Sequence, residues 1–316
     1  MSDTETVDST EYTDSDVLAS DDAEVEWRVR DAVEEEGINW DLLGPALRRY
    51  KTIITGSTLH PVFFKTASRR TGVDLCTPLK QEEPMAFFIE NDLTFAESSE
   101  PVGQYPGYAG FVRVRRFHKD EHTIYLIVVA DDNAATIIFN FYSTLDMNFV
   151  SGYGLFCAYP ELTLNKLSTT NPSAFDTSLD GSQFRRINAK IRNRGFTHNN
   201  QLCDHSDFRD HVCGTSKSCP STLRSMHDSG TLFVPFESTL TQAPTPTIYD
   251  GVHSIIWSLG GRPCRGEGLF TGLVVFSVPI FEAQVSITSP KQVLTLTTRR
   301  GENTRHSDFP DKCGLY

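Results

Sequence analysis

The sequence predicts an all-β protein, a sandwich or barrel built from about ten strands with few helices. Short segments rich in aromatic and β-branched residues recur along most of the chain, and turn-forming residues separate them. Apolar residues at helical spacing are found in only two places. A length of 316 residues is enough for one large β domain.

The strands are expected in two sets, each residue range being bounded by turn signals. The first set comprises 85–95, 110–117, 123–130, 136–142 and 154–160, and the second comprises 231–236, 254–259, 268–281, 283–287 and 292–298. In the segment Ala283–Ile287 apolar and polar side chains alternate, as in a half-buried antiparallel strand. The composition therefore indicates sheets that face a core on one side.

Two helical segments are expected. Ile38–Tyr50, before the strands, forms one short helix or two turns, with Asn39 as the N-cap. The other helix covers Gln183–Arg194, between the two strand sets. The second helix belongs to a long polar interval, Leu162–Asp228, which separates the two strand sets. One β domain with a long excursion fits this pattern better than two domains.

The negative charge is concentrated at the N-terminus. Met1–Glu36 holds fourteen acidic residues and two arginines, a net charge of −12 that equals the charge of the whole chain. Such a segment has few large apolar side chains to bury, so burial does not offset the entropy lost on ordering. We expect a mobile acidic arm unless a neighbouring subunit orders it. It is also the wrong charge for binding phosphates.

The chain gives no sign of secretion or membrane insertion. It has no signal-like N-terminus and no apolar run of about 20 residues. Seven scattered cysteines, an odd number, do not suggest a disulfide framework. We expect a reducing compartment, the cytoplasm.

A cluster of metal-ligand residue types lies in the excursion. Cys203, His205, His211 and Cys213 are candidate ligands, and Cys219 follows closely. Thiolate and imidazole suit zinc, but single-residue spacing within each pair departs from the usual separation of two to four residues. We therefore predict no metal and no other cofactor.

Catalytic signatures are absent from the sequence. It contains no nucleophile elbow, phosphate-binding loop or dinucleotide fingerprint. Cys157 and Cys264 could each meet a histidine, His118 and His253 for example, but a chain with seven cysteines and nine histidines offers many such pairs. No catalytic residue is assigned, and we do not expect an enzyme.

Basic residues gather on the second predicted helix. Arg185, Arg186, Lys190, Arg192 and Arg194 could face RNA phosphates without reading sequence. The alternative is a solvated basic helix that pairs with acidic neighbours, and this alternative is favoured.

The segment LFVPFES resembles the Val-Pro-(Tyr or Phe)-x-Ser element of capsid subunits from picorna-like positive-strand RNA viruses. It is carried here by Val234, Pro235, Phe236 and Ser238. The segments Phe270–Phe281 and Ala283–Pro290 follow in the order of that family's last strands. In the family, this element ends a strand against a neighbouring subunit, so these four residues become candidate interface residues.

The resemblance implies an eight-stranded antiparallel jelly-roll sandwich with long loops and few short helices. Residues 1–36 would be the acidic arm, 37–84 a lead-in with a short helix, 85–298 the jelly roll with the excursion at 162–228, and 299–316 a C-terminal extension. The implied function is a structural subunit that assembles with sister subunits, in the host cytoplasm, into the icosahedral shell of a non-enveloped virion around its RNA. The host receptor is not predicted. A β-sandwich module that binds protein or glycan is the alternative, followed by a zinc-dependent or cysteine enzyme.

Overall fold

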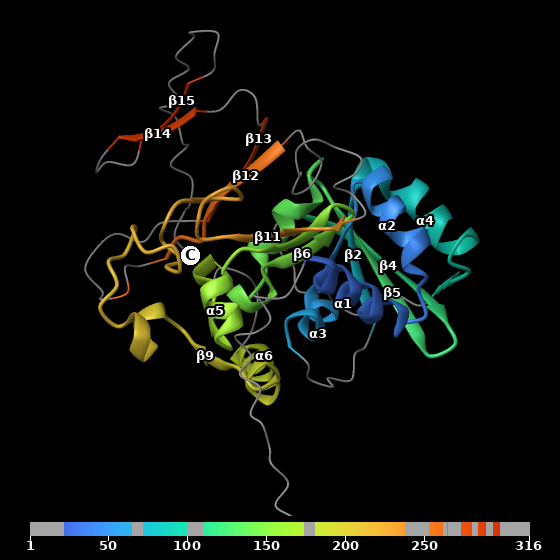
Figure 1. The fold of residues 1–316 in the computed structure, drawn as a ribbon, viewed down its shortest axis with the longest axis horizontal. Coiled ribbons are helices and arrows are strands. Elements are labelled where there is room, and N and C mark those ends of the chain that lie inside the picture. The colour runs from blue at the N-terminus through green and yellow to red at the C-terminus, as the bar shows by residue number, and fades with distance from the viewer. Residues whose placement is uncertain are drawn as a thin grey trace, which may run out of the picture.

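A mixed eight-stranded sheet forms the centre of the computed structural model, in the order β11-β7-β6-β1-β2-β5-β4-β3 (Figure 1). The structure describes residues 22–64, 72–99, 110–173, 181–237, 253–261, 264, 273–279, 284–288 and 293–297. The strands of this sheet are β1 (Ile53–Thr55), β2 (Val73–Pro78), β3 (Ala96–Glu97), β4 (Phe111–Lys119), β5 (His122–Val129), β6 (Asn148–Ser151), β7 (Gly154–Cys157) and β11 (Leu232–Pro235).

Strands β2 and β5 run parallel, with Leu75 opposite Leu126, and the other neighbours in this sheet are antiparallel. A parallel pair needs a crossover connection. The connection here contains α4 (Glu82–Asn91), β3 and β4. The sheet is therefore of the mixed type found in proteins that combine helices with strands.

The sheet is covered on both faces. Because successive side chains of a strand point to opposite faces, Ile54 belongs to one apolar cluster and Ile53 to the other, as do Leu155 and Phe156. The first cluster includes residues of α1 (Asp22–Glu34), α2 (Trp40–Arg49), α3 (His60–Phe63) and α4. The second includes residues of η4 (Ala134–Asn140), α5 (Pro160–Leu164) and β12 (His253–Ser258).

Three smaller sheets accompany the main one. β10 (Arg224–Ser225), β12 and β13 (Val274–Pro279) form the first, and β8 (Leu167–Thr169) pairs in parallel with β9 (Thr197–Asn199). The third consists of β14 (Gln284–Thr288) and β15 (Val293–Thr297). The last long helix, α6 (Gly181–Asn193), lies at the lower edge of Figure 1.

The mixed sheet contradicts the predicted all-β antiparallel jelly roll. Two segments expected to be strands are helical: 85–95 lies mostly in α4, and 136–142 lies mostly in η4. Both are apolar runs buried along much of their length, and such runs carry no period that separates a strand from a helix. Glu82, Glu83 and Pro84 in the first turn favour a helix start, a signal that sequence analysis did not weigh.

The segment described as a lead-in supplies β1 and β2 at the middle of the sheet. Part of the acidic arm is also ordered, since Asp22–Glu34 forms α1. Its side chains Val25, Val29, Ala32 and Val33 recur at helical spacing and are buried in the first cluster. The arm before residue 22 and the extension at 299–316 lie outside the described residues.

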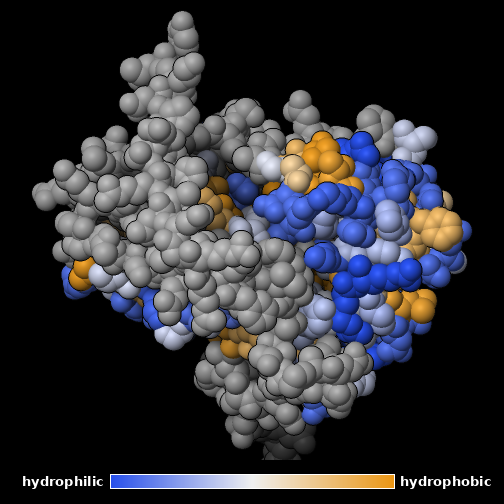
Figure 2. Space-filling model, turned by 90° about the horizontal axis from the view of Figure 1, so that it is seen from above, coloured by the Kyte–Doolittle hydropathy of each residue, from blue (hydrophilic) through white to orange (hydrophobic). Residues whose placement is uncertain are grey.

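The surface of the described residues is mostly hydrophilic, and apolar side chains form separate patches on the face shown in Figure 2. Trp27 and Phe87 are exposed to 68% and 64%. Scattered apolar side chains of this kind are normal on a protein surface. Within the described part of the chain, no helix is long and apolar enough to cross a membrane.

Candidate metal centre

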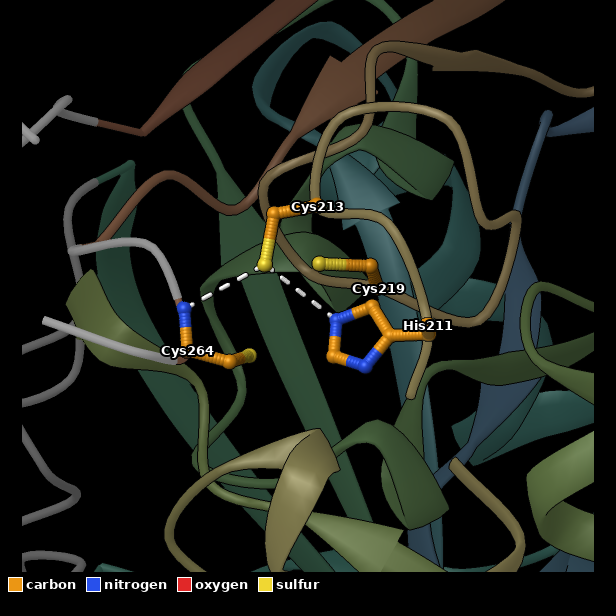
Figure 3. Close-up of side chains that lie close together, drawn as sticks. All are labelled: His211, Cys213, Cys219 and Cys264. Atoms are coloured by element: carbon orange, nitrogen blue, oxygen red, sulfur yellow. Dashed lines mark hydrogen bonds between the residues drawn. The ribbon is translucent and has the colours of Figure 1, made fainter. Parts of the chain in front are cut away.

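Four side chains with metal-binding chemistry converge where the loop before β10 meets the segment after β12. His211, Cys213, Cys219 and Cys264 each offer one ligand atom, and these atoms all lie within 4.8 Å of one another. Figure 3 shows the four side chains pointing into one space. A tetrahedral zinc with Zn–S bonds of about 2.3 Å places two sulfurs about 3.8 Å apart, so the observed spacing is close to that of a coordination sphere.

The His211 ring is held in the orientation and tautomer that a ligand needs. Its Nδ1 lies 2.7 Å from the carbonyl oxygen of Phe208. A carbonyl only accepts, so Nδ1 carries the proton and donates it. Nε2 is then left with a lone pair, 3.3 Å from the Cys213 Sγ. A backbone partner on the distal nitrogen is the usual outer-shell support of a metal-bound histidine.

A tight turn brings His211 and Cys213 back toward Cys219. The backbone N–H groups of Thr215 and Ser216 both donate to the Val212 carbonyl. Gly214 within this turn has φ +82°, a left-handed conformation that favours glycine. The Cys219 N–H then donates to Ser216, and Cys219 is fully buried in the second apolar cluster. Three ligands therefore belong to one compact loop.

The end of this loop is anchored by a buried arginine. Arg224 donates to both carboxylate oxygens of Asp228 at 2.6 and 2.8 Å, and its guanidinium lies over the rings of Tyr159 and Trp257. Burial acts to raise the pKa of Asp228, but Arg224 and two backbone N–H groups hold it below the usual value. The Asp228 carboxylate is therefore ionised and holds the Arg224 side chain of β10 in place.

The fourth ligand comes from the segment after β12. The Leu259 N–H donates to the Pro220 carbonyl at 2.9 Å, which fixes this segment next to the loop. Further along, the Cys264 N–H donates to the Cys213 Sγ at 3.2 Å. This contact is drawn in Figure 3 and is typical of the N–H···S bonds that support thiolate ligands. The site thus joins two parts of the chain.

The thiols interact directly. A hydrogen bond from the Cys264 thiol lowers the pKa of Cys219, and the same contact raises the pKa of Cys264 to about 12. Burial raises the pKa of Cys213. Metal ligation requires the thiolate form, which a cation at the centre of the cluster would favour for all three sulfurs.

Two of the four ligand candidates from the sequence lie elsewhere. His205 is buried, with Nε2 at 3.1 Å from the Ser168 carbonyl and Nδ1 at 3.2 Å from the Asn199 amide, so both ring nitrogens already have partners. Cys203 donates to the Cys264 carbonyl at 3.2 Å and is not one of the four converging groups. His211 and Cys213 are the two candidates that the structure brings together.

Cys219 and Cys264 were not among the candidate ligands expected from the sequence. Cys219 was noticed only as a neighbour, and Cys264 was considered only as a nucleophile. Cys264 follows Cys219 by 45 positions, so only the fold reveals their contact.

The other buried thiols do not form catalytic pairs with the histidine considered. Burial raises the pKa of Cys157 to about 12. Five strand spacings separate β7, which holds Cys157, from β4, which holds His118, a distance of about 24 Å. Burial also raises the pKa of Cys76. Thiols of this kind are inert as nucleophiles.

The residues expected at a subunit interface are used within this chain. Val234 and Pro235 pair with β7, and the Phe236 N–H donates to the Tyr153 carbonyl at 2.9 Å. Phe236 is 1% exposed, and its ring meets Trp40 edge-on at 5.6 Å. Ser238 lies outside the described residues. The element therefore closes the end of the sheet against α2.

The basic residues of the predicted helix do lie on α6. Arg185, Arg186, Lys190 and Arg192 are exposed, and Arg194 is half-buried just after the helix ends. Ile191 on the opposite side is buried in the first apolar cluster, and Phe184 and Ile187 pack against it. The helix therefore exposes its cations and buries its apolar face.

Comparison with known proteins identifies no relative: no family model, no curated protein and no solved structure matches the chain.

Proposed function

We propose that this chain is a zinc-binding protein in which one Zn²⁺ ion joins the loop before β10 to the segment after β12. The ligands would be His211, Cys213, Cys219 and Cys264. The observation that carries the proposal is the convergence of three sulfurs and one imidazole nitrogen within 4.8 Å. Three thiolates and one histidine are a ligand set that zinc binds in tetrahedral geometry.

The role of the ion would be structural. Four protein ligands complete a tetrahedron and leave no position for a water or substrate, whereas catalytic zinc sites keep one open. The loop that supplies three ligands is built mainly from turns, and few of its side chains, among them Leu202, Phe208 and Cys219, reach the apolar core. Metal binding would offset the entropy lost when such a loop is ordered.

The test is the metal content of the purified chain, measured by elemental analysis. We expect stoichiometric zinc in the unmodified protein and a large loss in Cys219→Ser and in Cys264→Ser. Cobalt substitution provides a second measurement, since Co²⁺ bound to thiolates gives charge-transfer absorption that reports sulfur ligation.

Cys203→Ser is the matched control, because Cys203 lies beside Cys264 but is not one of the four converging groups. It should keep its zinc. Absence of zinc and of cobalt binding in the unmodified protein would refute the proposal. Equal loss from Cys203→Ser and Cys264→Ser would show that the ligand set is wrong.

The capsid-subunit hypothesis now lacks its structural argument, because the mixed sheet is not a jelly roll. The same correction removes the basis for a β-sandwich binding module. Sedimentation of the purified chain as large assemblies would restore the capsid hypothesis independently of the zinc measurement.

A further inference from the structure

We infer that the outward face of α6 is a binding surface for the phosphate backbone of a nucleic-acid strand, contacted without sequence readout. This inference does not depend on the zinc site. The helix and the turn after it, residues 181–197, hold five cationic side chains and no acidic one. They are Arg185, Arg186, Lys190, Arg192 and Arg194.

Three of these cations form a stripe. Arg186, Lys190 and Arg194 are spaced four residues apart, so they follow one side of the helix with a rise of about 6 Å per step. Arg194 continues the helix closely, because its N–H donates to the Ile191 carbonyl at 3.1 Å. Arg185 and Arg192 lie along the other flank, seven residues apart. The stripe therefore presents a line of positive charge.

Helix stability alone does not account for this arrangement. Like charges four residues apart repel each other and destabilise a helix. Arg185 and Arg186 follow the first turn of α6, so the helix dipole, which acts within the first and last turns, does not stabilise their charge. Lys190 and Arg192 in the last turn do suit the dipole. The two arginines are the part that requires another explanation.

The acidic groups that the structure describes near α6 do not cancel its charge. Among the described residues, Asp146 interacts electrostatically with Lys190 and Arg194. Its carboxylate also lies 3.5 Å from the His60 ring. No ion pair is found between the five cations and any described acidic residue. Among the described residues, one partly buried carboxylate therefore lies near two of the five cations.

The opposite face of α6 argues against a lipid surface as the partner. Ile191 is buried, the Phe184 ring meets Tyr142 at 5.3 Å, and Asn188 accepts a hydrogen bond from the Tyr142 hydroxyl at 2.8 Å. A helix that lies in a membrane needs a free apolar face. The apolar face of α6 is instead packed against the core of the protein. The outward face has no aromatic side chain on which a base could stack, so phosphate contact is the available mode.

The experiment measures fluorescence anisotropy of labelled oligo-uridine RNA, about 16 nucleotides long, with the full chain at several salt concentrations. The test variant is Arg186→Gln with Lys190→Gln. Loss of two single-strand phosphate contacts should lower the salt slope by about 1.4 and weaken binding up to about 60-fold near 0.05 M salt. The control, Arg49→Gln with Lys80→Gln, removes the same charge from α2 and η3 (Leu79–Gln81) and should bind as the unmodified chain does.

Arg186→Lys with Lys190→Arg keeps the charges and should retain binding. A DNA strand of the same length should bind as RNA does, because phosphate contacts do not read the 2′-hydroxyl; binding of RNA alone would contradict this mode. Equal weakening by the test and control variants would overturn the assignment to α6. Binding of polyglutamate or of phosphatidylserine vesicles, without RNA binding, would overturn the nucleic-acid partner.

Discussion

His198 on β9 makes the stability of this fold sensitive to mildly acidic pH. The ring is 2% exposed, and its two nitrogens lie 2.6 Å from the Ser168 hydroxyl and 3.0 Å from the Thr170 hydroxyl. Burial, followed by the positive charge of Arg192, lowers its pKa from 6.5 to about 4. The folded state therefore holds this imidazole neutral.

The direction of the pH effect follows from proton binding. Between the folded pKa and the unfolded pKa, the unfolded chain binds more protons at this site, so stability is complete above about pH 6.5 and is lost as the pH falls toward 4. At about 1.36 kcal/mol per pKa unit, the full loss is roughly 3 kcal/mol. About 2 kcal/mol of it is lost by about pH 5.

The assay is urea unfolding of the unmodified chain and of His198→Asn at about pH 7.5 and about pH 5. Asparagine keeps hydrogen-bonding capacity but does not titrate in this range. Every other group titrates in both proteins, so the difference between their pH dependences isolates His198. We expect the variant to lose about 2 kcal/mol less between the two conditions. An identical loss in both proteins would refute the reasoning.

Three further predictions concern the core, a buried ion pair and the metal. Phe236→Ala should lower the free energy of unfolding by about 3–5 kcal/mol by emptying the space beside Trp40; unchanged stability with altered sedimentation would instead favour an interface role. Glu82→Ala should lower the free energy of unfolding by less than Phe236→Ala does, because Arg113 is 56% exposed and Arg115 keeps its ion pair with Glu97; a loss as large as that of Phe236→Ala would contradict this reasoning. Chelation of zinc should lower the melting temperature of the unmodified chain but leave that of Cys264→Ser unchanged.

Elements with a clear period could be predicted from the sequence. Asn39 caps α2 as expected, with its side chain accepting from the Asp41 N–H at 2.8 Å, and α6 covers the expected range. The pair β4 and β5 also lies where alternating and β-branched residues placed it. The period of apolar residues is sufficient to predict an element when one of its faces is buried and the other is exposed to solvent.

Elements buried on all sides could not be predicted in this way. In η4 the residues Ala134–Phe139 are all buried, so polarity marks no face. The segment that forms α1 was expected to be a mobile arm because of its many acidic residues. The helical spacing of its valines was therefore not recognised. The parallel pairing of β2 with β5 is a long-range contact, and the sequence carries no local sign of it.

Two of the four residues of the candidate metal centre could be predicted from the sequence. His211 and Cys213 lie in one short segment, where ligand types can be noticed. Cys264 needs the hydrogen bond between Leu259 and Pro220 to bring it into reach. The usual ligand spacings describe residues that share a turn, and they do not apply to Cys264, which lies in a separate segment after β12.

The position of Pro235 bears on how this protein avoids aggregating. β11 ends the order of the main sheet, and the Phe236 N–H points inward to Tyr153. Successive backbone nitrogens of a strand point to opposite sides, so the nitrogen of Pro235 faces outward. A foreign strand arriving at this edge would find no donor there and would leave one of its own carbonyls unpaired. The residue that resembled a docking signal in the sequence thus discourages sheet-to-sheet polymerisation.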